Sequence, residues 1–323
     1  MTNLGISALV SILALGVGCG DQAGDDSAAP LVSTGTTRFV VLGDAGTGSE
    51  AQYAVGEAMV QVCAERTDDL PGCDYALYMG DNFYNDGVDS VDDEQFQTKF
   101  ELPYADLDIP FYAALGNHDY GGEGLGSDWE QPDAQVAYSD VSDKWIMDDR
   151  YYQHDQAHVS FFVLDTNAIL WDSFWNGAAD QLAWLEQGLA DSDRAWRVAY
   201  GHHPYLSNGE HGSAGAYEGV EDVPVYSGGE VRDFVESGLC GKVDVYLSGH
   251  DHNLEWLEPS CGTQFIVSGA GGKLRDMVGW GAPSQFEYAD AEGFLWVEIR
   301  DETFTGVFYD RNAQALFEAS FTR

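Results

Sequence analysis

Five short apolar segments of strand length each end in a glycine that is followed by a residue able to bind a metal. The five motifs are Gly43-Asp44, Gly80-Asp81, Gly116-Asn117, Gly201-His202 and Gly249-His250. In sheets built from parallel strands and helices, ligand-binding residues gather beyond the carboxyl ends of the strands. The pattern therefore predicts an α/β fold whose strand ends deliver carboxylate, amide and imidazole groups to one place.

The distribution of apolar residues supports this fold class. Runs of strand length occur at 38–42, 75–79, 111–115, 158–164, 196–200, 243–247 and 264–267, with helical periodicity at 47–65 and 178–189. The segments 294–299, 303–309 and 315–321 have the pattern of an antiparallel meander without helices. We therefore expect two packed mixed β-sheets flanked by helices, in a single domain that spans residues 38–323.

Each motif alone also fits a structural role. Asp44 suits a turn, Asn117 suits a helix cap, and His202 suits a buried imidazole with a satisfied hydrogen bond. Five such residues at five strand ends are hard to produce by chance, and Tyr84 and His252 lie close to two of them in the sequence. Carboxylates, a phenol, an amide and imidazoles together are typical of a two-metal hydrolytic centre.

These motifs resemble those of the calcineurin-like metallophosphatases, and the tyrosine in Gly80-Asp81-Asn82-Phe83-Tyr84 narrows the resemblance to purple acid phosphatases of the small, tartrate-resistant type. The likeness runs from about Arg38 to the C-terminus in the same order, and includes 136–139, 162–166, 181–185, 246–254 and 267–271. The resemblance implies a four-layer α-β-β-α sandwich that hydrolyses phosphate monoesters at acid pH.

The resemblance also implies a ligand set for two metal ions. An Fe(III) ion would be held by Asp44, Tyr84, His252 and a bridging Asp81. A divalent ion (Fe, Zn or Mn) would be held by Asp81, Asn117, His202 and His250. The chemistry agrees, because Fe(III) prefers anionic oxygen ligands and the second site is more neutral. Hydroxide activated by the metals would be the nucleophile.

Two further histidines match positions that line the substrate side in that family. His118 follows Asn117, and His211 lies in a glycine-rich loop; with Asn117 they would bind the substrate, and both histidines would assist catalysis. His211 also fits an exposed loop residue without a role. His203 is not expected to bind a metal, and His154 and His158 receive no role.

The cysteines indicate an oxidised, exported domain. Cys63, Cys73, Cys240 and Cys261 are an even number. Of the three possible pairings we expect Cys63–Cys73 and Cys240–Cys261, since each closes a short local loop. Metal binding by these thiols is the alternative, but no close Cys-x-x-Cys pair supports it.

The first 37 residues have the character of a targeting region. Residues 4–17 resemble the apolar part of an export signal, and the small residues before Cys19 resemble the lipobox of bacterial lipoproteins. We expect a signal over 1–19 that ends at a lipidated Cys19, and a flexible acidic tether over 20–37. An ordinary secretory signal is the alternative, so the protein is a bacterial envelope lipoprotein or is secreted.

The formal net charge is −41, and Lys99, Lys144, Lys242 and Lys273 are the only lysines. Such a chain excludes nucleic acid and anionic membranes as partners, because phosphate backbones are bound by Lys and Arg. The expected partners are small phosphate esters, with membrane contact only through the lipid anchor, and the expected state is a monomer. The acidity suits either solubility or life in salty water.

Two other functions remain open at this point. A phosphodiesterase or nucleotide pyrophosphatase would use the same metal core, because the ligands alone do not set the ester class. A surface protein that binds phosphate or metal without hydrolysis is the second alternative.

Overall fold

The structure is a computed structural model that describes residues 1–2, 34–175 and 177–323. The predicted lipid-anchor residue Cys19, the apolar part of the predicted signal, and residues 20–33 of the predicted tether lie outside the described residues. From Thr34 to Arg323 the described residues form one compact unit. Among the residues described, no helix is both long enough and apolar enough to cross a bilayer.

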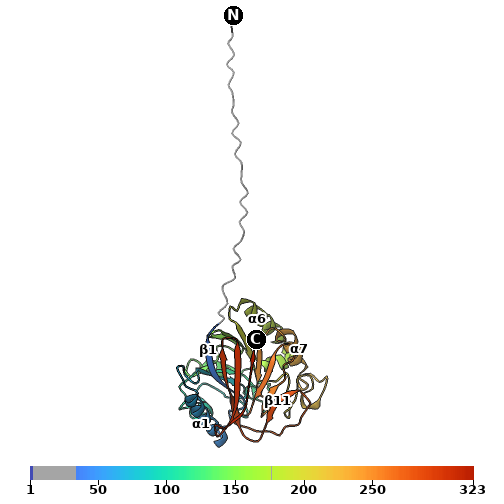
Figure 1. The fold of residues 1–323 in the computed structure, drawn as a ribbon. Coiled ribbons are helices and arrows are strands. Elements are labelled where there is room, and N and C mark those ends of the chain that lie inside the picture. Colours follow the sequence, from blue (N-terminus) through green and yellow to red (C-terminus); the bar gives the residue numbers. More distant parts are fainter. Residues whose placement is uncertain (3–33, 176) are drawn as a thin grey trace. The chain divides into compact units, whose positions relative to one another are not determined.

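Two seven-stranded mixed sheets form the centre of this unit, as predicted (Figure 1). The first has the order β14-β13-β12-β1-β2-β3-β4. Its strands are β1 (Thr36–Leu42), β2 (Tyr75–Met79), β3 (Phe111–Ala114), β4 (Trp145–Ile146), β12 (Gly293–Arg300), β13 (Thr303–Asp310) and β14 (Ala315–Thr322). Strands β1 to β4 pair in parallel, whereas β12 to β14 form the predicted antiparallel meander beside β1.

The second sheet has the order β11-β9-β10-β8-β7-β6-β5. Its strands are β5 (Tyr152–Gln156), β6 (Val159–Val163), β7 (Trp196–Tyr200), β8 (Val245–Ser248), β9 (Leu254–Leu257), β10 (Gln264–Ser268) and β11 (Ser284–Tyr288). Strands β6, β7, β8 and β10 are parallel, and antiparallel strands complete both edges. The carboxyl ends of β1, β2, β3, β7 and β8 therefore hold the five motifs.

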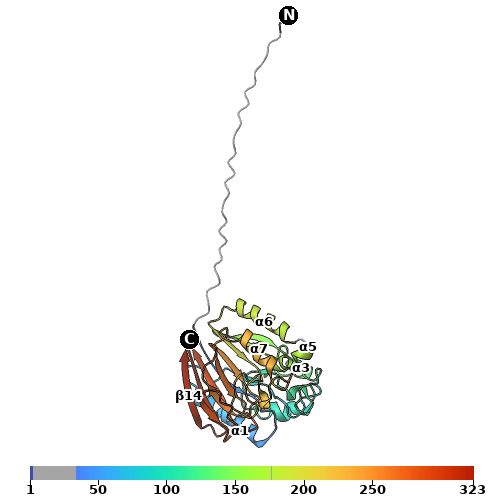
Figure 2. The same ribbon diagram turned by 90° about the vertical axis from the view of Figure 1, so that its right-hand side faces the viewer.

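The helical segments connect the strands and cover the sheets (Figure 2). They are α1 (Glu50–Glu65), α2 (Glu94–Phe96), η1 (Gln97–Glu101), η2 (His118–Tyr120), α3 (Asp133–Tyr138), α4 (Thr166–Leu170), α5 (Asp172–Trp175), α6 (Gly177–Asp191), η3 (Tyr217–Gly219) and α7 (Gly229–Gly238). Helix α1 begins at Glu50 because the Ser49 side chain accepts a hydrogen bond from the Gln52 amide.

The alternation of side chains along β6 shows how the layers pack. Phe161 points between the sheets, where its ring lies 5.5 Å from that of Phe39 on β1. Phe162 points to the other face and belongs to the cluster that contains Leu185 of α6 and Phe234 of α7. Because successive strand residues face opposite sides, one strand contributes to both apolar layers. The arrangement is the predicted sandwich of two sheets with helices outside.

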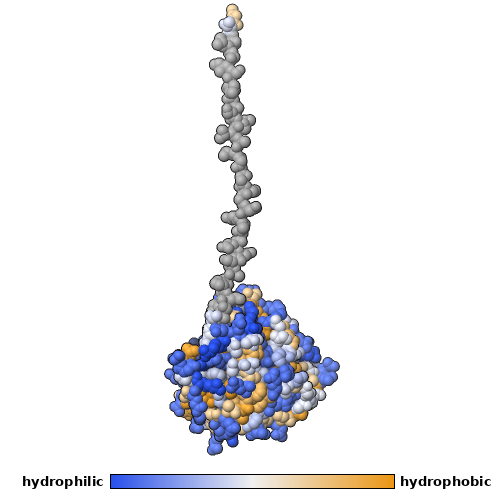
Figure 3. Space-filling model, viewed as in Figure 1, coloured by the Kyte–Doolittle hydropathy of each residue, from blue (hydrophilic) through white to orange (hydrophobic). Residues whose placement is uncertain are grey.

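The remaining predictions about the domain have mixed outcomes. Both predicted disulfides, Cys63–Cys73 and Cys240–Cys261, are present. The predicted tether ends too late: β1 begins at Thr36, because Thr36 and Thr37 already pair with Arg300 and Ile299 of β12. The face of the molecule in Figure 3 is largely hydrophilic with scattered apolar patches, in keeping with the acidic composition.

Candidate metal centre

Strand ends from both sheets meet at the candidate centre. Asp44 and Asp81 follow β1 and β2 of the first sheet, and His202 and His250 follow β7 and β8 of the second. The sheets are joined here by hydrogen bonds: the Gly43 amide donates to the Ser268 carbonyl (2.8 Å), and the Ser268 hydroxyl donates to the Val41 carbonyl (2.9 Å). These bonds fix the spacing between strand ends that are far apart in the sequence.

Three of the five motif glycines are explained by the close approach of a candidate ligand's side chain. A Cβ atom on Gly116 would lie 2.3 Å from Asp81 Oδ1, and one on Gly249 would lie 2.5 Å from Asp44 Oδ2. On Gly80 it would lie 2.8 Å from His202 Nδ1. Each glycine therefore makes room for a side chain delivered by another strand.

Three of the candidate ligands also have a left-handed backbone, which is unusual for residues with a side chain. The φ angles are 59° at Asp44, 53° at Asp81 and 68° at His250. Such conformations cost free energy and persist where the surrounding structure determines them, commonly at functional sites. Here they turn the chain directly after each strand, where the side chains of Asp44, Asp81 and His250 lie near the other candidate ligands.

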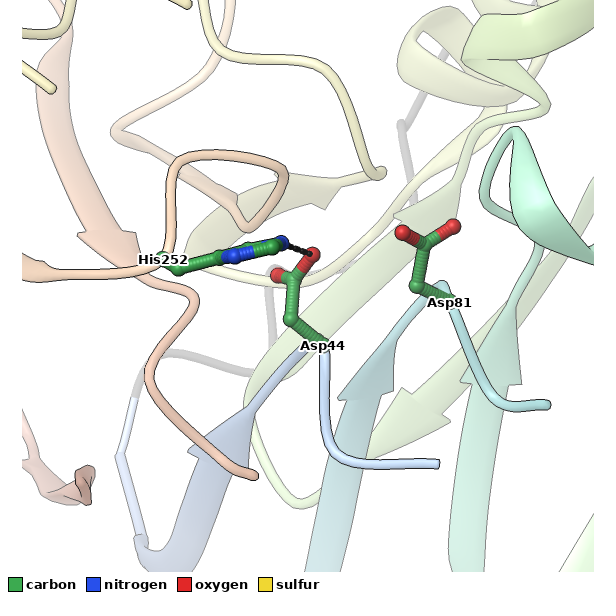
Figure 4. Close-up of side chains that lie close together, drawn as sticks. All are labelled: Asp44, Asp81 and His252. Atoms are coloured by element: carbon green, nitrogen blue, oxygen red, sulfur yellow. Dashed lines mark ion pairs between the residues drawn. The ribbon is translucent and has the colours of Figure 1, made fainter. Parts of the chain in front are cut away.

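A first group of donors surrounds Asp44. One ligand atom from each of Asp44, Asp81 and His252 lies within 4.8 Å of the others, and all three residues are buried (Figure 4). The Tyr84 hydroxyl donates to Asp44 Oδ1 (3.0 Å) and lies 3.1 Å from His252 Nε2. Two carboxylates, a phenol and an imidazole thus lie together, and they are the residues that the family resemblance implies for an Fe(III) ion.

A second group of donors surrounds His202. Its Nε2 atom lies 3.0 Å from Asn117 Oδ1, 3.1 Å from His250 Nδ1 and 3.4 Å from Asp81 Oδ1. The Nδ1 atom of the same ring lies 3.0 Å from the Met79 carbonyl, so it carries the proton and Nε2 presents its lone pair. The Asn117 amide nitrogen donates to the Gly124 carbonyl, which directs its oxygen to the same point.

This second group fits a cation. The lone pair of His202 Nε2 and the oxygens of Asn117 and Asp81 are all acceptors, and nothing in their own chemistry supplies a hydrogen between them. A bound cation satisfies such acceptors, and an amide, imidazoles and a carboxylate suit a divalent transition metal. Asp81 belongs to both groups, as a bridging ligand requires.

The electrostatics also suit bound cations. Burial raises the pKa of Asp44 to about 7 and lowers that of His252 to about 3. Burial would raise the pKa of Asp81 as well, but it is lowered to about 2 when the adjacent His202 and His118 rings carry positive charge and the His118 amide donates to it, and a bound cation would supply such a charge in place of protonated imidazoles. Neutral imidazoles are the form that binds metals, and buried carboxylates need positive charge beside them.

The two predicted outer histidines flank these groups. The His118 ring lies 4.5 Å from that of Tyr84, and its Nε2 lies 4.0 Å from Asp81 Oδ2. The His211 ring stacks on His250 at 4.2 Å. The structure therefore brings all nine predicted metal and substrate residues into one region, and their individual roles stay predictions.

Sequence reasoning missed several residues that organise this region. The buried Asp119 carboxylate accepts from the amides of Gly116 (2.8 Å) and Asn82 (2.9 Å), and the Asp251 carboxylate accepts from the His211 amide (2.7 Å). Asp119 comes two residues after Asn117, and Asp251 lies between His250 and His252. Their positions beside candidate ligands could have identified them from the sequence.

Two other neighbours gave no signal in the sequence. Glu218 forms a hydrogen bond to His211 Nδ1 from seven residues further along the chain. The Lys273 ammonium lies 3.6 Å from the centre of the Tyr84 ring, although the two residues are far apart in the sequence. Both contacts depend on how the loops fold back over the strand ends.

Comparison with known proteins agrees with this geometry. The family model for calcineurin-like phosphoesterases matches residues 37–254. Tartrate-resistant acid phosphatase type 5 of Mus musculus is 30% identical, over 91% of this chain and 94% of that protein, and purple acid phosphatase 4 of Arabidopsis thaliana is 28% identical, over 87% and 82%.

The solved structures show the same fold. The structure described as GAP50, the anchor in the inner membrane complex of Plasmodium, has a TM-score of 0.68 at 22% identity and covers 89% of each chain. A structure of PhoD has a TM-score of 0.58 at 15% identity, over 91% of this chain and 70% of that one. The chain therefore belongs to the calcineurin-like phosphoesterase family, and it is a phosphoesterase whose site is suited to metal ions.

Proposed function

We propose that this protein hydrolyses phosphate monoesters at acid pH with a centre of one Fe(III) ion and one divalent ion of Fe, Zn or Mn. The observation that carries the proposal is the position of Tyr84, whose phenol oxygen lies between Asp44 Oδ1 (3.0 Å) and His252 Nε2 (3.1 Å). A phenol between a carboxylate and an imidazole is a donor set that favours Fe(III). The similarity to tartrate-resistant and purple acid phosphatases supports the same assignment.

Asp44, Tyr84 and His252 would hold the Fe(III) ion, and Asn117, His202 and His250 would hold the divalent ion, with Asp81 between them. When bound, the two ions would neutralise the phosphate and lower the pKa of a bound water. This neutralisation explains how so acidic a protein accepts an anionic substrate.

Residues of the chain itself would orient the ester and supply the proton that the leaving alcohol needs. The P–O bond to the alcohol breaks while a bond from water oxygen to phosphorus forms, and the alcohol oxygen needs a proton. His211 is held from one side by the Glu218 carboxylate and from the other by stacking on His250, so its ring is fixed beside the candidate centre. His118 donates from Nδ1 to the Asn85 carbonyl, which leaves Nε2 facing the site.

The test combines metal analysis, a visible spectrum and rates on the purified protein. We expect two metals per chain, a charge-transfer band from iron–tyrosinate, and faster hydrolysis of a monoester than of the matching diester or of a nucleotide pyrophosphate at acid pH. A preference for the diester or pyrophosphate would assign the second ester class. Two bound metals without hydrolysis of any ester would favour a binding protein.

We further propose that the protein is an exported monomer tethered through lipid on Cys19. Two disulfides indicate an oxidising compartment. The mature protein should begin at Cys19 and partition into detergent, and a Cys19→Ala variant should be released. A different mature start contradicts the lipid anchor. Because of the charge of −41, we expect no binding to nucleic acid in a mobility assay.

A further inference from the structure

A pocket of about 160 Å³ adjoins the candidate centre on the side of Asn117 and His250. Both residues line it, and so does His211. An ester whose phosphate is held at the centre therefore extends its alcohol portion toward this pocket. The pocket was not predicted from the sequence, because its wall comes from segments that are far apart in the chain, among them the end of α4.

Five other lining residues are apolar and form what is here named the apolar wall. It consists of Leu125, Leu170, Tyr217, Val225 and Tyr226. Leu170, Tyr217 and Val225 are at most 7% exposed and form the base, whereas Leu125 and Tyr226 are 44% and 59% exposed and form the rim. The Tyr217 hydroxyl donates to the Pro204 carbonyl, so the ring and not the hydroxyl is available to a ligand.

The loop that carries this wall is held in place by its own packing. A Cβ atom on Gly228 would lie 2.2 Å from the Tyr217 ring, so the ring packs directly on the backbone there. The Tyr217 amide donates to the Ser227 carbonyl (3.1 Å), and the Trp280 indole donates to the Gly209 carbonyl (2.7 Å). The apolar wall is therefore a formed surface.

The charge of the pocket selects against an anionic group. Among the described residues that line the pocket are one carboxylate, Glu218, and the imidazoles of His203, His211 and His250, but no lysine or arginine. The volume suits one aromatic ring, since a cavity of about 150 Å³ is large enough for benzene. An uncharged apolar group gains from burial against such a wall, whereas an anion would lose hydration against the apolar side chains and meet the Glu218 carboxylate.

We propose that this pocket receives the alcohol portion of the substrate, and that it selects phosphate monoesters whose leaving group is uncharged, apolar and about the size of one aromatic ring. The proposal rests on the monoesterase activity proposed above and names its substrate class. Hydrolysis then releases this alcohol, which takes up a proton, and inorganic phosphate.

The test compares benzyl phosphate with glycerol phosphate, because both release alkyl alcohols and the comparison then reports binding more than leaving-group chemistry. We expect kcat/KM to be roughly 10-fold or more higher for benzyl phosphate. An analogue of the same size with a charge, 4-carboxybenzyl phosphate, should lose this advantage. Independently of turnover, calorimetry should show that benzylphosphonate binds more tightly than methylphosphonate.

Two rim substitutions, Leu125→Ser and Tyr226→Ser, should each lower the ratio of the benzyl to the glycerol rate. Both side chains are exposed, so the variants should fold. Leu102→Ser is the matched control, because Leu102 is 53% exposed and lies outside the pocket, and it should leave the ratio unchanged. A wild-type ratio near one, or a ratio that both rim variants retain, overturns the pocket assignment while the proposed function stands. Hydrolysis of neither ester overturns the proposed function, and the pocket assignment with it.

Discussion

Tyr84 is the residue that distinguishes this candidate centre from a set of carboxylates, amide and imidazoles. Its burial, with Asp44 and Asp81 nearby, raises the pKa of the phenol well above its ordinary value. The phenol therefore ionises only if a cation replaces its proton. An iron-bound phenolate would absorb visible light, which the other candidate ligands would not do.

Tyr84→Phe keeps the ring and removes this oxygen, so the visible band should vanish and the iron content should fall. Absorption spectra and elemental analysis of iron-loaded protein measure both. Tyr53→Phe is the control, because it removes a hydroxyl that donates to the Thr98 carbonyl and is not among the candidate ligands. A colourless wild type, or a Phe variant with an unchanged band, would show that Tyr84 only packs beside the site.

A substitution at Gly116 tests whether the motif glycines are needed for the candidate ligands to lie at the right distances from one another. Because a Cβ atom there would lie 2.3 Å from both the amide nitrogen and Oδ1 of Asp81, Gly116→Ala should displace the shared carboxylate. We expect kcat/KM to fall by about 100-fold or more, as small displacements of reacting groups do. Metal content should fall with it.

The matched control for Gly116→Ala is Gly229→Ala at the start of α7, where the nearest side-chain atom would lie 3.7 Å away. Its activity and metal content should equal those of the wild type. If Gly116→Ala also behaves as wild type, the close packing of strand ends does not determine the site.

At the scale of elements, the sequence predicts the strands that hold the site better than those at the edges. The strands β1, β2, β3, β7 and β8 are mostly apolar and mostly buried, because both of their faces are covered. The antiparallel strand β5 has the sequence Tyr-Gln-His-Asp-Gln and carries no such signal. Its place depends on pairing with β6, which no local pattern shows.

The same reasoning applies to the site. Motifs placed each candidate ligand at a strand end, and the parallel fold then brought them together. The contacts of Glu218 with His211 and of Lys273 with Tyr84 could not be predicted from the sequence, because they depend on how the loops fold back over the strand ends. The apolar pocket could not be predicted from the sequence for the same reason.

The imidazole of His154 on β5 makes the stability of this edge depend on pH. The ring stacks between Tyr112 (3.9 Å) and Phe161 (4.8 Å), and burial lowers its pKa to about 3. In the unfolded chain His154 gains a proton near pH 6.5, whereas in the folded chain it stays neutral down to about pH 3. The free energy of unfolding therefore falls as the pH drops from about 6.5 toward 3.

In urea titrations between pH 7.5 and 4.5, His154→Phe should show a shallower loss of unfolding free energy than the wild type. The difference should approach about 1.4 kcal/mol per pH unit below pH 6. The pH 7.5 values serve as the reference, since both rings are uncharged there. Parallel curves for the two proteins would show that His154 does not contribute.

The disulfides join helix ends to neighbouring strands. Cys63 at the end of α1 is linked to Cys73 before β2, and Cys240 after α7 is linked to Cys261 between β9 and β10, at sequence separations of 10 and 21. Replacing both cysteines of either pair by alanine should cost about 2–4 kcal/mol of unfolding free energy.

The pair with the longer loop should cost slightly more, by about 0.6 kcal/mol for a doubling of loop length. Urea unfolding of each double variant measures this, and the wild type under reducing conditions is the control for the loss of both bonds. A free thiol in the wild type, detected by non-reducing peptide mapping, would contradict the oxidised structure.

At the scale of the whole molecule, the most prominent property is the negative net charge. The chain has 55 acidic residues and 14 lysines and arginines, so its formal net charge is −41. Mutual repulsion of this kind destabilises a compact state. Exposed ion pairs such as Arg150–Asp133 act in the opposite direction, but each contributes at most about 1 kcal/mol and few basic residues exist to form them.

Salt should therefore stabilise this protein. Between 0.01 M and 1 M NaCl the screening length falls from about 30 Å to about 3 Å, so repulsion between surface carboxylates is largely removed while few attractive pairs are lost. We expect Tm to rise with NaCl, and to rise equally with KCl. Scanning calorimetry on metal-loaded and chelated protein separates this effect from metal binding, and sucrose at equal osmolality is the uncharged control. A Tm that stays constant or falls with salt would mean that repulsion between the carboxylates does not limit stability, and the acidity would then be better explained by solubility than by life in salty water.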